Sequence, residues 1–588
     1  MSTLNPLKMA DWEIAQSAET KMKTIQELGE ELGLKTEEVH PYGHYMGKLD
    51  TNLILARLKD RPNGKYIDIT AITPTPLGEG KSTTTIGLLQ GLGYIGKKAS
   101  AAIRQPSGGP TFNIKGSAAG GGLSQCIPLA DFSLGLTGDI DAITKAHNLA
   151  MVALTSRMQH EFNYGDKTLE KKNLKRLHIN PKNVSISWAI DFCAQSLRNI
   201  IIGLGGKLDG FMMHSGFQIS VSSELMAILA IAKDLKDMRE RIGKMIVAYD
   251  NRGNPITTSD LEVAGAMTAI MAKAIMPSLL QTIEGQAVLV HAGPFANIAI
   301  GQSSIVADYI GLKLSDYHLT ESGFGADIGF EKFCSLKCRF SRLKPDCAVI
   351  VATVRALKMH GGGPKVVPGK KLDEAYTQKN IGLLENGISN LIAHIETVQK
   401  AGVPAVVCIN HFYTDHDDEI QFIREKIEAI GARVAVSKHW LKGGEGAKEL
   451  AEMVVEACEE PNQFKYFYND EDSIKEKIEA LATKVYGADG VEYSAEANKK
   501  IAALEADDRF KHLNVCMVKT HLSLSDDPYL KGRPEGWRLS VHDILVYQGA
   551  EFIVPMAGTI KLMPGTASDP NYRRIDIDTD TGAVTGLF

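Results

Sequence analysis

Short apolar runs rich in β-branched residues recur along the chain, and each is followed by polar or glycine residues and then by a helical pattern. The runs are residues 66–72, 98–103, 245–249, 287–291, 347–354, 405–410 and 434–437. Continuous apolar strands that alternate with helices are typical of a parallel sheet covered on both faces. The pattern therefore predicts an α/β fold built on a large parallel sheet.

The two ends of the chain have different patterns. Residues 12–34 place apolar side chains at helical spacing and predict one helix. From about residue 460 the pattern is first helical and then strand-rich, at NVCMVK and EFIVPM. With boundaries near the glycine- and proline-rich segment 361–370 and after Cys458, we predict a large nucleotide-binding domain over 1–365, a smaller α/β domain over 366–460 and a mixed C-terminal domain over 461–588.

The segments that follow the strands are the candidates for a binding site, because ligands of such sheets bind beyond the carboxyl ends of the strands. These segments are TPTPLGEGKS, RQPSGGP, HAGPFANIAIG, RALKMHGGGP, NHFYTD and KHWLKGGEG. They are rich in glycine, cationic side chains and aromatic rings. That composition suits a large anionic ligand with a flat ring.

The segment TPTPLGEGKS resembles a phosphate-binding loop of the pattern G-x-x-x-x-G-K-[ST], with Thr75 at the position of the first glycine. It follows a predicted strand and opens a predicted helix, so backbone N–H groups and the helix dipole would face a phosphate. We predict a P-loop-type nucleotide site; the alternative is a chance turn. In it, Lys81 reaches the terminal phosphates and Ser82 is a ligand of Mg²⁺. The residues predicted to bind the nucleotide are Thr75, Pro76, Leu77, Gly78, Glu79, Gly80, Lys81 and Ser82.

Arg104 opens a second glycine-rich segment, RQPSGGPTFNIKGSAAGGG, directly after a predicted strand. It should therefore lie beside the phosphate loop. A guanidinium group there can hold a carboxylate or an acyl phosphate through two parallel hydrogen bonds. The alternative is an arginine in an ordinary surface ion pair.

Two other motifs have simpler interpretations. Gly91, Gly93 and Gly96 spell the dinucleotide-binding pattern G-x-G-x-x-G, but they lie at the far end of the helix that the phosphate loop begins. We expect these glycines to end that helix. The segment 411–419, HFYTDHDDE, resembles a metal-binding cluster, but we expect it to begin a helix that Thr414 or Asp415 caps.

Composition limits the class of protein. The 588 residues include 65 basic and 70 acidic ones, for a net charge of −5, which lacks the basic surplus of a nucleic-acid-binding protein. No apolar run approaches the ~20 residues of a membrane span, and residues 1–16 do not resemble a secretory signal. The eight cysteines are scattered, as in reduced proteins. We therefore expect a cytoplasmic enzyme with reduced thiols, without nucleic-acid or membrane partners.

Several motifs occur together and in order along the chain: TPTPLGEGKSTTTIGL, RQPSGGPTF, LTGDI, HAGPFANIA, GFGADIG, VATVRALKMHGGGP, KGGEGA and SLSDDP. Together they resemble the formate–tetrahydrofolate ligase family, also called 10-formyltetrahydrofolate synthetase. The forms RQPS and HGGGP are similar to its eukaryotic-type branch. The resemblance implies that ATP phosphorylates formate to formyl phosphate, whose formyl group then passes to tetrahydrofolate to give 10-formyltetrahydrofolate, ADP and phosphate.

The resemblance also implies roles for single residues. Thr75 to Ser82 would hold the triphosphate, with Lys81 neutralising the transferred group, and Arg104 would hold formate and formyl phosphate. Phe412 and Trp440 would sandwich the pterin or its neighbouring ring, and Asp139 would lie at the pterin-side pocket. A monovalent cation (K⁺ or NH₄⁺) and a homotetramer are implied as well.

The chain departs from the family pattern at three histidine positions, which hold Gly135, Asp141 and Ile300. Other departures are Asn113, Ser117, Leu123 and Gln218. Because these positions are expected near the active site, two alternatives stay open. One is the same acyl-phosphate chemistry on a different carboxylate or amine acceptor, and the other is a catalytically weak homologue that acts as a binding protein.

Overall fold

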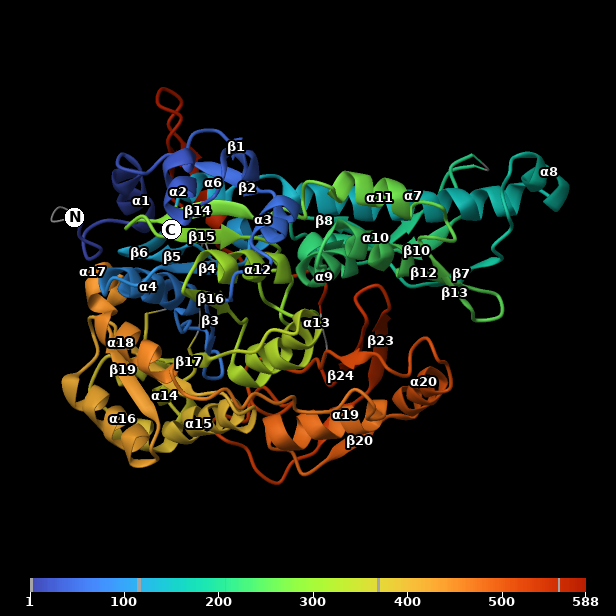
Figure 1. Cartoon of the computed structure of the whole chain (residues 1–588). Coiled ribbons are helices and arrows are strands. Elements are labelled where there is room, and N and C mark those ends of the chain that lie inside the picture. Colours follow the sequence, from blue (N-terminus) through green and yellow to red (C-terminus); the bar gives the residue numbers. More distant parts are fainter. Residues whose placement is uncertain (1–3, 114–117, 207, 367–370, 559–560, 588) are drawn as a thin grey trace.

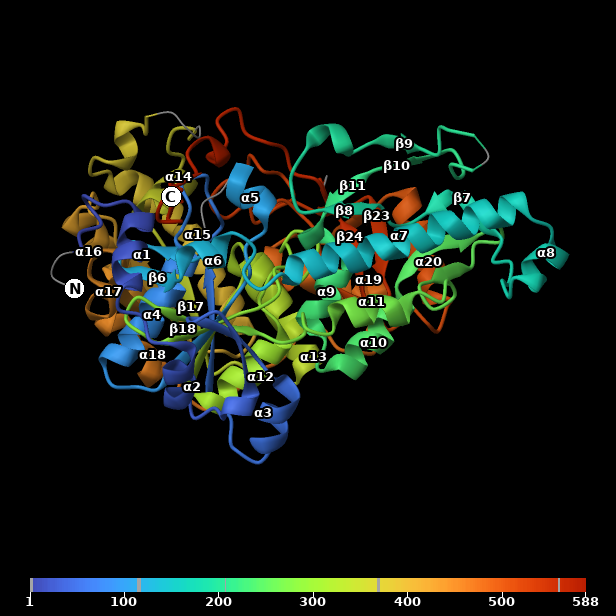
Figure 2. The same cartoon turned by 90° about the horizontal axis from the view of Figure 1, so that it is seen from above.

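The computed structural model describes residues 4–113, 118–206, 208–366, 371–558 and 561–587. A large sheet with the strand order β1-β2-β14-β15-β4-β16-β3-β17-β18-β19 forms its centre, and helices lie on both sides of it (Figure 1). A long helix, α7 (Asp139–Asn163), projects from this body, as the two perpendicular views show (Figures 1 and 2).

The parallel part of the sheet matches the predicted apolar runs. Its strands pair in parallel with their neighbours, so their carboxyl ends lie at one edge of the sheet. They are β15 (Ala287–Val290), β4 (Ala99–Ile103), β16 (Tyr317–Glu321), β3 (Lys65–Ala71), β17 (Cys347–Ala352), β18 (Ala405–Asn410) and β19 (Arg433–Ser437). The predicted α/β class with a large, mainly parallel sheet is confirmed.

Alternate residues of one strand explain why the runs are apolar throughout. In β17, Ala348 and Ile350 pack into a core with α14 (Val354–His360) and α15 (Ile381–Lys400). Val349 and Val351 pack into a different core with α4 (Lys81–Tyr94) and α18 (Lys448–Ala457). Because neighbouring side chains of a strand point to opposite faces, both faces of the sheet are covered.

The other border of the sheet is antiparallel. There β1 (Val39–Tyr42), β2 (Met46–Leu49) and β14 (Ser278–Thr282) pair antiparallel with their neighbours, and β6 (Ser124–Ile127) pairs with β14. The prediction that run 245–249 belongs to the parallel sheet was wrong. The corresponding strand β12 (Ile246–Asp250) lies between β7 (Ile179–Val184) and β13 (Pro255–Thr257) in a separate antiparallel sheet.

The single helix predicted over residues 12–34 is two helices, α1 (Asp11–Glu19) and α2 (Ile25–Leu32). The first helix ends at Glu19, and Thr24 caps the second, because its hydroxyl accepts a hydrogen bond from the N–H of Glu27. The Glu27 carboxylate in turn accepts one from the N–H of Thr24 at 2.7 Å. This reciprocal pattern is a capping box, and it starts a new helix although the apolar spacing continues.

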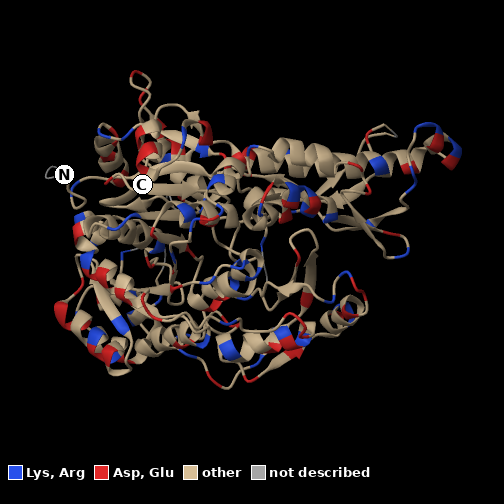
Figure 3. Cartoon of the chain, in the orientation of Figure 1, with Lys and Arg blue, Asp and Glu red and all other residues tan. Residues whose placement is uncertain are grey.

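The C-terminal segment follows the predicted order of elements. Its helices α19 (Ile474–Leu481) and α20 (Ala495–Glu505) come first, and its strands β21 (Asn514–Val515) and β24 (Phe552–Met556) fall on the two predicted segments. The division into three domains stays a prediction; β17 and β18 pair side by side across its first boundary. No helix in the described ranges is long and apolar enough to cross a membrane. Acidic and basic residues are interspersed over the whole fold (Figure 3).

Candidate functional site

Seven chain segments start at the carboxyl edge of the parallel strands. The loop after β3 leads into α4, and Arg104 follows β4 directly. Glu321 ends β16, which pairs with both β3 and β4. The segments after β15, β17, β18 and β19 start from the same edge. The predicted nucleotide loop and Arg104 therefore start from strands that β16 alone separates.

The loop between β3 and α4 is anchored at both ends by buried hydrogen bonds. The Thr73 hydroxyl accepts a bond of 2.9 Å from the Asn390 side chain and lies 3.0 Å from Nε2 of His394, both on α15. At the other end, the Asn410 side chain donates to the carbonyl of Glu79 at 2.9 Å. These bonds hold the loop in place before any ligand binds.

The replacement of the first motif glycine by Thr75 does not strain the backbone. Positive φ angles occur in this loop at Gly78 (+73°) and Gly80 (+74°), and Thr75 has none. The Thr75 N–H instead donates to the Glu79 carboxylate at 2.7 Å. A Cβ on Gly80 would lie 2.5 Å from Nδ2 of Asn410, so this position requires glycine.

Lys81 is the first residue of α4, and Gly80 is its N-cap. The first N–H groups of a helix have no intrahelical acceptor, so those of Lys81 and Ser82 are free to bind an anion at the positive end of the helix dipole. Burial lowers the pKa of Lys81, an effect that Arg104 increases and that the carboxylates of Glu79 and Glu321 oppose. Lys81 therefore lies in a small cluster of two cations and two carboxylates.

Arg104 and Glu321 face each other across neighbouring strands. The distance from Nη2 of Arg104 to Oε1 of Glu321 is 3.5 Å. Nε of Arg104 and Oε2 of Glu321 are buried without a hydrogen-bond partner in the described residues. Gly323 makes room for the guanidinium group, because a Cβ there would lie 3.3 Å from Nη1 of Arg104. Arg104 thus retains donors for a ligand.

Glu321 was not predicted from the sequence. Its strand reads YHLTE, which alternates apolar and polar residues and does not form an apolar run. The available signal was its position two residues before the motif GFGADIG, which places a carboxylate where a glycine-rich segment leaves the sheet.

The aromatic residues after β18 and β19 lie in the expected region but with a different pairing. Trp440, on α17 (His439–Gly446), stacks on Tyr413 with ring centroids 6.3 Å apart and planes 28° apart. The Phe412 ring contacts the Arg355 guanidinium at 4.6 Å. Gly122 leaves space for Trp440, since a Cβ there would lie 2.7 Å from the indole ring. Tyr413, which is exposed, was missed by the sequence analysis although it is adjacent to Phe412.

Asp139 is the first residue of α7, and its carboxylate forms a buried ion pair with Nζ of Lys48 at 2.6 Å. Burial raises the pKa of Asp139, and the contact with Lys48 opposes this shift. Oδ2 of Asp139 has no partner in the described ranges. One carboxylate oxygen is therefore occupied by Lys48, and the other is available.

The three positions without a histidine differ in their surroundings. Gly135 is exposed, has a φ of +123° and accepts a hydrogen bond of 3.4 Å from Gln105, and Asp141 is exposed. Ile300 is fully buried in the apolar core.

The other departures from the family pattern make local contacts. The side chain of Asn113 donates a hydrogen bond to the Cys193 carbonyl, and the Leu123 N–H donates one to the Trp440 carbonyl. The Gln218 amide lies 3.4 Å from the ring of His147. Ser117 is outside the described residues.

The two simpler motif interpretations can be compared with the structure. Gly91 and Gly93 lie in the last turn of α4, and Gly96 follows it with a φ of +77°, so the expectation that these glycines end the helix is confirmed. Segment 411–419 does begin a helix, α16 (Asp417–Ala429), but the predicted cap was wrong. Its N-cap is His416, because Asp415 accepts from the Phe412 N–H and Thr414 from Arg355.

The carboxyl edge of the parallel sheet carries a lysine at a helix N-terminus, a neighbouring arginine and stacked aromatic rings. These are groups that a phosphoryl-transferring enzyme needs. The family model "Formate--tetrahydrofolate ligase" matches residues 9–588. The chain belongs to this family and is a ligase.

Curated relatives share the full length of the chain. A formate–tetrahydrofolate ligase of Desulforapulum autotrophicum is 65% identical over 589 residues, which cover 100% of both chains. Another from Dehalococcoides mccartyi is 65% identical over 588 residues, 100% of this chain and 98% of the relative. A third from Lawsonia intracellularis is 64% identical over 590 residues, 100% of both chains.

Proposed function

We propose that the carboxyl edge around Lys81 and Arg104 is the place where this ligase joins formate to tetrahydrofolate at the expense of ATP. The observation that carries the proposal is the cluster of Lys81, Arg104, Glu79 and Glu321 at the start of α4. Full-length identity with relatives named for this reaction favours formate and tetrahydrofolate over another acid or acceptor.

The residues of the edge suit the two chemical steps. Residues 75–82 would bind the triphosphate, and Lys81 would neutralise the phosphoryl group as it passes to a formate oxygen. Arg104 would hold formate and then formyl phosphate by two parallel hydrogen bonds. Phosphoryl transfer depends mainly on position and charge, so this step needs no covalent intermediate with the protein.

Mg²⁺ would be held mainly by the nucleotide. The described residues contain no group of three or more His, Cys, Asp or Glu side chains that could hold a metal. Ser82, half-buried in the first turn of α4, supplies a hydroxyl oxygen of the kind Mg²⁺ prefers alongside phosphate oxygens. A monovalent cation, a homotetramer and a cytoplasmic location stay predictions.

Trp440 would stack on the pterin or its neighbouring ring. Phe412 or Tyr413 is the partner ring on the other side, and the contact of Tyr413 with Trp440 makes Tyr413 a further candidate. Asp139, with one free carboxylate oxygen, would accept a hydrogen bond at the pterin-side pocket.

The proposal is tested by measuring ADP release from ATP, Mg²⁺ and formate, with and without tetrahydrofolate. We expect full turnover only when all substrates are present. Turnover only with a different acid or amine would select the alternative substrate. No turnover with any acid would favour the binding protein.

Trp440→Ala should raise the Michaelis constant for tetrahydrofolate far more than that for ATP. The reason is the loss of stacking worth about 1–3 kcal/mol, the range for a base on an aromatic side chain. Steady-state kinetics of the variant with each substrate varied in turn provide the measurement. A selective effect on ATP would instead assign Trp440 to the adenine ring.

Ile300→His should destabilise the protein without improving the use of formate. Ile300 is fully buried among apolar side chains, and a polar ring without a partner there costs about 1–3 kcal/mol. Thermal unfolding and the Michaelis constant for formate provide the two measurements. Unchanged stability together with more efficient use of formate would mean that the lost histidine marks an altered acyl site.

A further inference from the structure

Glu321 has a free carboxylate oxygen beside the proposed acyl site. Oε1 lies 3.5 Å from the guanidinium group of Arg104. Oε2 is buried and has no hydrogen-bond partner in the described part of the chain. An unpaired buried carboxylate oxygen is costly, and at an active site it commonly has a chemical role.

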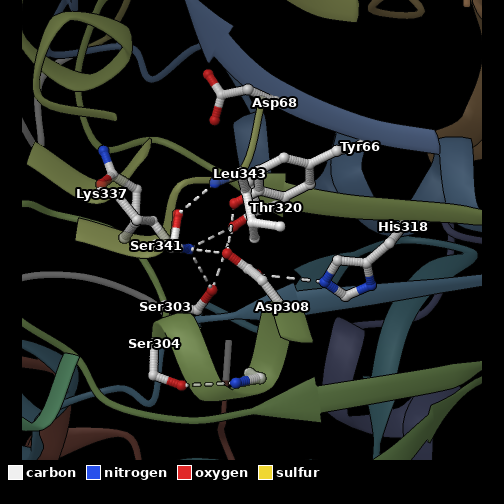
Figure 4. Close-up of polar contacts among 12 residues, drawn as sticks. Tyr66, Asp68, Ser303, Ser304, Asp308, His318, Thr320, Lys337, Ser341 and Leu343 are labelled. Carbon is white, nitrogen blue, oxygen red and sulfur yellow. Dashed lines mark hydrogen bonds and ion pairs between the residues drawn. The ribbon is translucent and has the colours of Figure 1, made fainter. Parts of the chain in front are cut away.

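A buried polar network fixes the strand on both sides of Glu321. Before it, the Thr320 hydroxyl accepts a hydrogen bond of 3.1 Å from Nζ of Lys337, which also forms an ion pair of 2.6 Å with Asp308. After it, the Ser322 hydroxyl donates to Asp68 on β3 at 2.6 Å. Figure 4 shows Thr320, Lys337 and Asp308 converging, with Asp68 nearby. The backbone of Glu321 is therefore held rigidly.

The strand geometry directs Glu321 toward α4. Side chains of a strand alternate between faces, and Thr320 points into the polar network (Figure 4). Leu319 packs in the same core as Ile86 and Leu88 of α4, so Glu321, two residues later, lies on that face. The side chain thus points to the side of the sheet on which Lys81 begins α4.

We propose that Glu321 accepts the proton that N10 of tetrahydrofolate loses when it attacks formyl phosphate; this inference rests on the proposed function of the edge. A formyl group held by Arg104 lies within a few ångströms of the Glu321 carboxylate, because both contact the same guanidinium group. The attacking amine must approach that formyl carbon. Oε2 is then the free basic atom within reach.

The step balances in atoms and charge. The N10 lone pair forms the bond to the formyl carbon, and the bond from that carbon to the phosphate oxygen breaks, so phosphate leaves with the electron pair. The N10 proton moves to Oε2 of Glu321. It then passes to the departing phosphate or to water, which restores the carboxylate for the next cycle.

Glu321→Gln separates the two half-reactions. Without tetrahydrofolate, formyl phosphate made from ATP and formate can be trapped by hydroxylamine as formyl hydroxamate. We expect the variant to form hydroxamate close to the wild-type rate, because Arg104 and Lys81 are intact. The single-turnover rate of 10-formyltetrahydrofolate formation should fall by about 10²–10⁴-fold, the usual contribution of a positioned acid or base. Glu321→Asp should retain part of this rate.

Glu224→Gln is the matched control. Glu224 is another buried glutamate, on α9 (Glu224–Ile231), and it accepts hydrogen bonds from the N–H groups of Gly549 and Ala550. We expect its formyl transfer to match that of wild type, so a loss confined to Glu321→Gln is specific to that carboxylate.

Other outcomes would overturn the proposal in distinguishable ways. If Glu321→Gln loses both half-reactions equally, Glu321 only positions Arg104. If it loses neither, phosphate or water accepts the proton. If the wild-type enzyme itself forms no hydroxamate from formate and ATP, the formyl phosphate route fails, and the proposed function fails with it.

Discussion

Lys81→Ala should yield a folded protein whose turnover is lower by at least about 10²–10³-fold, the loss seen when one preorganised electrostatic group is removed. Lys81 is the first residue of α4, where the N–H groups have no intrahelical acceptor, so the terminal phosphate would lose its fixed counter-charge. Folding should survive, because the side chain is only half-buried and alanine is a good helix former.

The measurement is the rate of ADP release with saturating ATP, formate and tetrahydrofolate, together with thermal unfolding of the variant. Lys97→Ala is a suitable control, because Lys97 is an exposed lysine just beyond the other end of the same helix. Near-normal turnover of Lys81→Ala would mean that residues 75–82 are not the nucleotide site. Loss of turnover in the Lys97 variant as well would indicate a general effect on α4.

The strands that could be predicted are those whose two faces are both covered by helices. Such a strand is apolar at nearly every position, as in β17 and in β18 up to its last residue, Asn410, and this signal is local. β16 escaped prediction because His318 and Thr320 point into a buried polar network, where Asp308 and Lys337 satisfy them. Its polar residues are buried because they contact residues distant in sequence, and no local sequence pattern indicates such contacts.

The predictions for β12 and for the helix over residues 12–34 were wrong because apolar spacing alone was used. The run that became β12 is as apolar as its counterparts, but its partners β7 and β13 determine which sheet it joins. The break between α1 and α2 had a local signal, the Thr24 and Glu27 capping box, which the apolar spacing of residues 12–34 obscured. Periodicity alone indicates neither strand partners nor helix ends.

At the candidate site, the sequence predicted the residues that belong to recognisable motifs. It missed the residues that reach the site only through the pairing of strands distant in sequence. Lys81 belongs to a recognisable loop, and Arg104 could be placed because it follows a predicted strand. Glu321 depends on β16 lying between β3 and β4, and Lys48 reaches Asp139 from a strand 91 residues earlier in the chain. Such contacts require the three-dimensional fold.

Arg104→Lys should lose about 2.7–4 kcal/mol of transition-state stabilisation, if one preorganised donor is a fair guide. Lysine keeps the charge but cannot make two parallel hydrogen bonds, so a point charge is a poor substitute at this position. In the arginine, Nη2 faces Glu321 at 3.5 Å and another guanidinium nitrogen remains to reach an acyl oxygen. Lysine has one nitrogen and cannot do both.

The test compares kcat/KM for formate and for ATP in wild type, Arg104→Lys and Arg104→Ala. We expect both variants to lose efficiency mainly with formate, and lysine to recover little of what alanine loses. Thermal unfolding serves as the control for folding, because the side chain is one-quarter exposed and its contact with Glu321 is long. Equal efficiency of Arg104→Lys and wild type would exclude a bidentate contact. A loss confined to ATP would move Arg104 from the acyl group to the nucleotide.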